Sequence, residues 1–161
     1  MRCFIILIGI DPGKNGALAA LRSGEIVGED PLGGRLVCTW NFKDLTEQDI
    51  WKLFEPFSKC SCRALIEKVH SFPAQGVRSM FSFGQIYGSL RMALIAARIP
   101  FEEVSPMKWQ KTLECQSKGD KNITKAKAQQ IYPDLKVTHA NADALLIATY
   151  LLRKVSGEIT A

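Results

Sequence analysis

The chain has 161 residues, of which 47% are hydrophobic and 23% are charged. This is the size and composition of one ordinary domain, so we expect a single domain over residues 1–155 and a frayed tail over 156–161. The longest hydrophobic run, residues 3–10, is much shorter than the roughly 20 residues that a membrane-spanning helix needs, and no cleavage site for secretion follows it. We therefore expect a cytoplasmic protein with no membrane partner.

The chain contains five cysteines, an odd number without a C-x-x-C pair, which favours a reducing compartment. Cys60 and Cys62 would share one face of a strand, but no second Cys or His pair has the spacing of a zinc site. Free cysteines are commonly buried in protein cores, so we expect no zinc.

The formal net charge is +5, and most of it lies between residues 105 and 130. This window holds two acidic residues and six lysines, which are Lys108, Lys111, Lys118, Lys121, Lys125 and Lys127. Such a cluster is typical of a protein that binds a polyanion, but it is also typical of a solvated helix face.

The first half of the chain predicts three strands and a helix. Residues 3–10 form a continuous apolar run, which indicates a strand buried on both faces that ends at Asp11. A Pro- and Gly-rich turn follows, and residues 17–32 predict two short strands that meet around Ser23 and Gly24. Apolar residues at helical spacing predict a first helix over 44–57.

The second half alternates strands and helices. We expect a strand over 62–69, a loop over 71–78, a long helix over 79–98 and a strand over 101–104. A short helix from Pro106 to Trp109, a basic helix over 122–132 and a last helix over 139–154 complete the chain. This order predicts an α/β fold with a five-stranded mixed sheet flanked by helices, its first three strands antiparallel.

Three carboxylates occupy positions where burial of a charged group costs free energy. Asp11 and Glu67 lie at the ends of apolar strands, and Asp143 lies on the apolar stripe of the last helix. If the strand ends are neighbours and the helix crosses them, the three acids converge. Oxygen ligands without cysteine favour Mg²⁺ or Mn²⁺, and two such ions about 4 Å apart would suit phosphodiester hydrolysis.

Each of these acids also has a purely structural interpretation. Asp11 precedes Pro-Gly and could initiate a turn, and Glu67 could form an ion pair with Lys68 at the strand end. His139 lies four residues before Asp143 and could ligate a metal or orient water, but it could equally be a helix cap or a surface residue. The joint occurrence of the three acids favours the metal site.

Five motifs together resemble the RuvC-type Holliday junction resolvases of the RNase H-like superfamily. They are IGIDPGKNGALAAL at 8–21, ALIEKVHSFP at 64–73, SFGQIYGSL at 82–90, SPMKWQKTL at 105–113 and HANADALLIATYLL at 139–152. They span nearly the whole chain in the order of that family. The residues of these motifs are most similar to those of the phage and plant-chloroplast branch.

The resemblance implies an RNase H-like nuclease domain that acts as a homodimer. It implies that Asp11, Glu67, Asp143 and His139 are the catalytic and metal-binding residues, with two Mg²⁺ ions per site and Mn²⁺ as a substitute. The long helix would form the dimer interface through Gly84 and Gly88. The lysines expected to face DNA phosphates are Lys108, Lys111, Lys118, Lys121 and Lys125, of which Lys118 and Lys121 would lie nearest the cleaved strand.

The chain departs from the bacterial branch of this family at two places. Ala140 stands where that branch has a second aspartate on the last helix, and His70 stands where it has an aromatic wedge. We therefore expect Phe72 to stack on a base at the junction, although a loop Phe that covers the core is an equal alternative.

The function that follows is a structure-selective endonuclease of DNA recombination and repair, which makes symmetric metal-dependent nicks in two opposing strands of a four-way junction. Bacterial or phage-infected cytoplasm is the expected location, with an organelle matrix as the setting of a processed form. Two alternatives remain: a non-cleaving junction-binding protein, and one half of an actin-like or sugar-kinase-like ATPase. The ATPase alternative requires a second similar domain, for which 161 residues leave no room.

Overall fold

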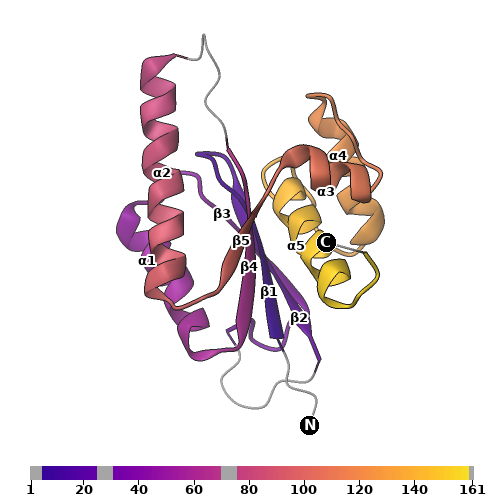
Figure 1. Cartoon of the computed structure of the whole chain (residues 1–161), viewed down its shortest axis with the longest axis horizontal. Helices are drawn as coiled ribbons and strands as arrows, with labels where there is room; N and C mark the ends of the chain where they lie inside the picture. The colour runs from indigo at the N-terminus through magenta and orange to yellow at the C-terminus, as the bar shows by residue number, and fades with distance from the viewer. Residues whose placement is uncertain (1–4, 25–30, 70–75, 160–161) are drawn as a thin grey trace.

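Five strands form one mixed sheet in the order β3-β2-β1-β4-β5 in a computed structural model of the chain, which describes residues 5–24, 31–69 and 76–159 (Figure 1). The strands are β1 (Ile5–Asp11), β2 (Ala17–Ser23), β3 (Val37–Asn41), β4 (Cys62–Glu67) and β5 (Phe101–Val104). β1, β2 and β3 pair antiparallel, whereas β4 is parallel to both β1 and β5. The expected mixed sheet with three antiparallel strands at its start is confirmed.

Helices cover both faces of this sheet (Figure 1). α1 (Glu47–Phe54), the short 3-10 helix η1 (Glu55–Lys59) and α2 (Val77–Ala96) pack on one face. α3 (Pro106–Thr112), α4 (Lys121–Ile131) and α5 (Ala142–Val155) pack on the other face. No helix in the described parts of the chain is long and apolar enough to cross a membrane.

β1 lies at the centre of the sheet and is buried on both faces. Ile6, Ile8 and Ile10 point into the core beneath α1 and α2, and Leu7 points into the core beneath α5. A side chain at Gly9 would collide with the backbone of α5 at Ala144 and Ala148. Glycine therefore permits α5 to lie directly on β1, and this close approach brings the start of α5 toward the end of β1.

The third strand is not where the sequence pattern placed it. The partner of β2 is Val37–Asn41, beyond the expected range of 17–32. Residues 25–30, which the prediction assigned to that strand, lie outside the described part of the chain. Each residue of β3 is at least partly exposed, so the hydrophobic signal of this edge strand is weak.

The last helix begins at Ala142, three residues later than expected. Asn141 Oδ1 accepts a hydrogen bond of 2.8 Å from the backbone N–H of Thr138, and Thr138 Oγ1 accepts one of 3.3 Å from the backbone N–H of Asn141. These reciprocal bonds close a turn before the helix starts. His139 lies in this turn and not on α5.

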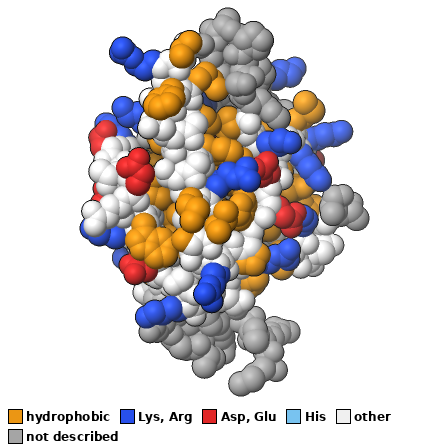
Figure 2. Space-filling view, turned by 60° about the vertical axis from the view of Figure 1, so that its left-hand side comes forward, with side chains coloured by type: hydrophobic (Ala, Val, Ile, Leu, Met, Phe, Trp, Pro, Cys, Tyr) orange, Lys and Arg blue, Asp and Glu red, His pale blue; other side chains and the backbone are white. Residues whose placement is uncertain are grey.

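α2 carries hydrophobic residues on the side that faces away from the sheet. Val77, Phe81, Met92 and Ile95 are exposed, by 86%, 68%, 59% and 58%. Gly84 and Gly88 lie between them, and a side chain at either position would meet open space. Figure 2 shows this side of the molecule, where hydrophobic side chains gather in several groups and charged side chains lie beside and between these groups.

Candidate active site

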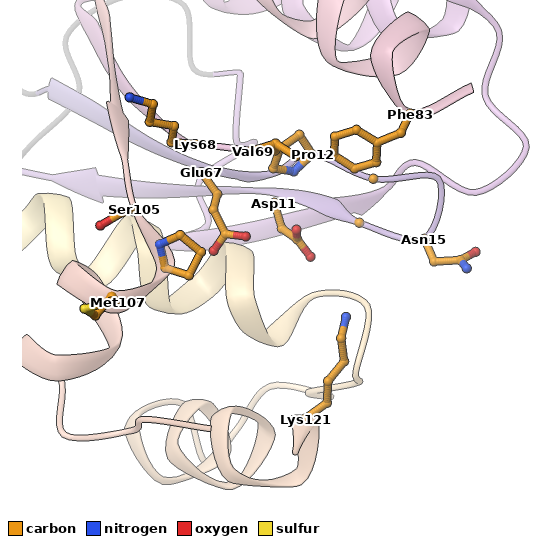
Figure 3. Close-up of a pocket in the computed structure, with 13 residues that line it drawn as sticks. Asp11, Pro12, Asn15, Glu67, Lys68, Val69, Phe83, Ser105, Met107 and Lys121 are labelled. Atoms are coloured by element: carbon orange, nitrogen blue, oxygen red, sulfur yellow. The ribbon is translucent and has the colours of Figure 1, made fainter. Parts of the chain in front are cut away.

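Asp11 and Glu67 are the last residues of two neighbouring parallel strands. Ile10 of β1 is in register with Ile66 of β4, so the two acids that follow leave the sheet side by side. Both line one pocket of about 600 Å³ at this edge of the sheet (Figure 3). The expectation that the two strand ends are neighbours is confirmed.

The turn after β1 folds closely around the backbone of Asp11. Gly16 donates a backbone hydrogen bond of 3.0 Å to Gly13 and accepts one of 2.9 Å from Phe42. A side chain at Gly16 would overlap the carbonyl of Asp11, so only glycine permits this tight return. The backbone of Asp11 is thereby packed into the turn, while its carboxylate points into the pocket (Figure 3).

Glu67 is held by a residue from another element. The indole Nε1–H of Trp109 on α3 donates a hydrogen bond of 2.8 Å to Glu67 Oε2. Trp109 has no exposed surface and belongs to the core between the sheet and α5. The sequence pattern does not reveal this role of Trp109; the available signal was that a buried indole N–H usually needs an acceptor.

Asp143 lies in the first turn of α5 and is not among the residues that line the pocket. Its Oδ1 atom is buried and has no hydrogen-bond partner among the described residues. Its charge raises the pKa of Asp11 and, to a smaller extent, that of Glu67. All three predicted acids therefore share one electrostatic environment.

Burial and mutual repulsion raise the pKa of both pocket acids. The pKa of Asp11 is raised to about 6, first by burial and then by Asp143. The pKa of Glu67 is raised to about 7 by burial and by Asp11, against the lowering effect of the Trp109 hydrogen bond. An added cation would relieve the cost of charging these groups.

Lys121 is the member of the lysine cluster that reaches this pocket. It is the first residue of α4 and points toward the pocket, and its charge lowers the pKa of Asp11 and Glu67 (Figure 3). Asp120 caps the helix by accepting a 2.9 Å hydrogen bond from the backbone N–H of Asn122. Before the cap, Lys118 and Gly119 adopt φ angles of 47° and 96°, a sharp turn that brings the chain into the helix.

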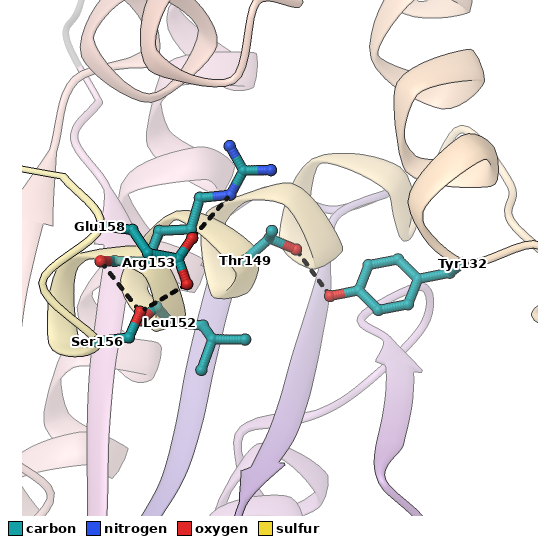
Figure 4. Close-up of polar contacts among 6 residues, drawn as sticks. All are labelled: Tyr132, Thr149, Leu152, Arg153, Ser156 and Glu158. Atoms are coloured by element: carbon teal, nitrogen blue, oxygen red, sulfur yellow. Dashed lines mark hydrogen bonds and ion pairs between the residues drawn. The ribbon is translucent and has the colours of Figure 1, made fainter.

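The side chains of α4 and α5 keep these two helices together. Tyr132, at the end of α4, shares a hydrogen bond of 2.7 Å with Thr149 of α5 (Figure 4). Thr149 Oγ1 also lies 2.7 Å from the carbonyl of Leu145. This contact fixes the element that carries Lys121 to the element that carries Asp143.

Other predicted site residues do not line the pocket. Lys108, Lys111 and Lys118 are exposed and Lys125 is half-buried, on or near α3 and α4. His139 is exposed in the turn before α5. Phe72 and His70 lie outside the described residues.

The oxygen donors at this site suit a hard divalent cation. Within residues 5–24, 31–69 and 76–159, no three His, Cys, Asp or Glu side chains form a ready-made metal cluster. Asp11 and Glu67 nevertheless line one pocket, and Asp143 Oδ1 is a buried acceptor with no donor in the described parts of the chain. Carboxylate oxygens in this setting match the ligand preference of Mg²⁺ and Mn²⁺, so the residues fit such an ion.

Comparison with known proteins shows the fold of this chain. No protein-family model and no curated protein sequence matches it. Solved structures do match it, among them Thermus thermophilus RuvC, with 19% identity and a TM-score of 0.61, and T. thermophilus RuvC in complex with a Holliday junction substrate, with 16% identity and a TM-score of 0.63. Each match covers 96% of both chains. The chain thus has a RuvC-like, RNase H-like fold, and these matches do not assign it to the phage and plant-chloroplast branch.

Proposed function

We propose that the protein is a divalent-metal-dependent endonuclease that resolves four-way DNA junctions. The observation that carries this proposal is the pair Asp11 and Glu67, which line one pocket at the ends of adjacent strands within the electric field of Asp143. A RuvC-like fold supports it, and one of the similar structures contains a Holliday junction.

In this proposal Asp11, Glu67 and Asp143 hold Mg²⁺, with Mn²⁺ as a substitute. Bound metal supplies activation of water and stabilisation of negative charge during phosphodiester hydrolysis. Trp109 keeps one oxygen of Glu67 in place and thereby orients the carboxylate toward the pocket. His139 would assist as a ligand or as a group that orients water, after a change in the turn that now exposes it.

The lysines position the DNA backbone. Lys121 places its positive charge at the pocket that holds the acids, where it would attract the phosphate to be cleaved. The exposed lysines on and near α3 and α4 would contact flanking phosphates, which fixes the position of DNA without reading its sequence. Phe72, in our proposal, stacks on a base at the branch point.

Symmetric cleavage requires two active sites, and the α2 face offers an interface for a second copy. Its exposed apolar residues lie on both sides of Gly84 and Gly88, where a neighbouring helix could approach the backbone closely. Analytical ultracentrifugation of the wild type and of Phe81→Lys tests this interface. The proposal expects a dimer that the substitution dissociates, and a wild-type monomer at micromolar concentration contradicts it.

The test of the proposed function uses a synthetic four-way junction with each strand labelled in turn, incubated with the protein and Mg²⁺. We expect paired nicks in two opposing strands, lost in Asp11→Asn while junction binding persists. Asp134→Asn serves as a matched control because Asp134 is exposed and does not line the pocket. Shifted but uncut DNA with the wild type would support a junction-binding protein, and nucleotide hydrolysis without nicking would support an ATPase.

A further inference from the structure

The candidate active site has an apolar wall that metal and phosphate binding do not explain. Beside the two acids, the pocket is lined by five hydrophobic residues, which are Pro12, Val69, Phe83, Pro106 and Met107. Phosphate groups and metal ions are held by charged and polar groups. An apolar wall next to such groups suits a ligand that carries a flat apolar face close to its negative charge.

Phe83 is the aromatic member of this wall, and neighbouring side chains hold its ring in place. It comes from α2, on the other side of the sheet from Met107, and its ring edge would lie 3.8 Å from a side-chain carbon placed at Gly13. Behind it, the ring of Tyr87 is stacked nearly parallel, with centroids 6.5 Å apart and an angle of 20° between the planes. The Phe83 ring thus lies beside the turn that follows Asp11.

Tyr87, in turn, is fixed from two directions. Its hydroxyl donates a hydrogen bond of 3.0 Å to Glu103 of β5. The guanidinium of Arg91 lies over its ring, 5.6 Å from the centroid. These contacts hold Phe83 against a rigid support, and a rigid aromatic surface loses little conformational freedom when a ligand stacks on it.

Met107 contributes the other side of the pocket mouth. It lies in the first turn of α3 and is 75% exposed. In Figure 3, Phe83 and Met107 lie on opposite sides of the Asp11 and Glu67 pair. A group that enters between them would have apolar contacts on its flanks and the acids beneath it.

We propose that Phe83 is a stacking platform for the nucleobase next to the cleaved phosphate, with Met107 enclosing the same nucleotide from the other side. This inference rests on the proposed nuclease function and deepens it by assigning a base subsite. A nucleotide combines a phosphate with a flat aromatic face, which is the combination that the acids, Lys121 and Phe83 together require. Because every base has such a face, the contact would hold any base.

The subsite also fits branched DNA better than an intact duplex. A base within a continuous stack has both faces covered by its neighbours, so stacking on Phe83 requires a base that has lost a neighbour. Unstacking a base costs free energy, and the cost is smallest where base pairing is already disturbed. Phe83 would therefore favour cleavage next to a branch point.

The test uses 2-aminopurine, a fluorescent base, placed on either side of the nick sites mapped with the wild type. Binding is measured in an Asp11→Asn background, which keeps the junction uncut, and nicking rates are measured in the wild-type background. Phe83→Leu retains an apolar side chain and removes the aromatic face, whereas Phe83→Trp retains an aromatic face. Leu36→Ala is the off-site control because Leu36 is 63% exposed and does not line the pocket.

We expect the emission of 2-aminopurine to change on binding, with Phe83→Leu abolishing the change and Phe83→Trp preserving it. The loss of stacking on one base corresponds to about a tenfold lower nicking rate for Phe83→Leu. Equal emission and equal nicking by wild type and Phe83→Leu would overturn the inference. Absence of nicking by the wild type overturns the nuclease proposal instead, and thermal unfolding of each variant identifies any that fails to fold.

Discussion

Trp109 and Glu67 are 42 positions apart in the chain, and the indole of one donates a 2.8 Å hydrogen bond to the carboxylate of the other. Trp109 is fully buried in the core beneath α5, whereas Glu67 lines the pocket. The hydrogen bond therefore connects the core of the domain to one oxygen of a candidate metal ligand. Hydrogen bonds that hold ligating carboxylates from behind tune both their orientation and their affinity for metal.

The variant Trp109→Phe should weaken both folding and metal use. A hydrogen bond to a charged group contributes about 1.5–3 kcal/mol, and the variant leaves Glu67 without this donor. A double-mutant cycle with Glu67→Ala, which removes the acceptor, is measured by urea unfolding and separates the hydrogen bond from the change in core packing. We expect a coupling of at least 1 kcal/mol and a severalfold higher Mg²⁺ concentration at half-maximal nicking. A coupling near zero would show that the bond contributes nothing.

The stability of the metal-free protein should fall as pH rises from about 4 to about 7. The ordinary pKa values of Asp11 and Glu67, 3.8 and 4.5, apply to the unfolded chain, and the folded values are about 6 and about 7. Between these limits the folded state binds more protons than the unfolded state, so the free energy of unfolding decreases with rising pH. The loss should reach a few kcal/mol, because each pKa unit corresponds to about 1.4 kcal/mol.

Chemical unfolding over this pH range in the presence of a chelator measures the effect. The double variant Asp11→Asn, Glu67→Gln is the control, since it lacks both titrating groups. We expect the free energy of unfolding of the wild type to fall toward pH 7 relative to that of the double variant. A constant difference would show that these carboxylates titrate normally in the folded protein.

The variant Asp143→Ala should be more stable than the wild type and inactive. Asp143 has a buried oxygen without a partner among the residues that the structure describes, and its charge repels Asp11 and Glu67. Removing it relieves both costs. These gains exceed the loss of the favourable interaction between its negative charge and the N-terminus of α5. We expect a net gain of about 1 kcal/mol without metal, which raises the thermal midpoint by about 2–4 °C.

Asp134→Ala provides the matched control for this measurement, because Asp134 is an exposed acid outside the site. Its thermal midpoint should stay close to that of the wild type. Destabilisation by Asp143→Ala in the absence of metal would mean that Asp143 is a structural residue, contrary to our assignment.

The variant Lys121→Met should bind junction DNA less tightly, with a weaker dependence on salt. Lys121 reaches the pocket from the first position of α4. Each phosphate contact contributes about 0.9 to the slope of log K against log salt concentration, so we expect the slope to fall by about this amount. Lys52→Met, on α1 at the opposite face of the sheet, should leave it unchanged. The same slope for both variants would remove Lys121 from the DNA interface.

The sequence was sufficient to predict those parts of the fold that have strong periodic signals. The Ile-rich run before Asp11 and the apolar segment before Glu67 are buried on both faces, so their hydrophobicity alone indicates central strands. β3 could not be placed in this way, since an exposed edge strand has little hydrophobic contrast with a loop. The start of α5 was misjudged because reciprocal hydrogen bonds between Asn141 and Thr138 close a turn there, and hydrophobic periodicity does not reveal such bonds.

The candidate site was predictable in its acids and less so in its surroundings. A carboxylate after an apolar strand is conspicuous, which is why Asp11 and Glu67 could be selected from the sequence. The partners of Glu67 were hidden because Trp109 reaches it only through the packing of α3 against the sheet. Likewise, the turn at Gly119 determines that Lys121 lines the pocket and Lys118 does not.

Binding of Mn²⁺ to the protein, followed by electron paramagnetic resonance, tests most directly whether the three acids form a divalent-cation site. The account predicts saturable loss of the free Mn²⁺ signal with the wild type, competition by Mg²⁺, and strong weakening in Asp11→Asn and in Glu67→Gln. Asp134→Asn should bind as the wild type does. Equal Mn²⁺ binding by the wild type and both site variants, or no binding by any of them, would contradict the account.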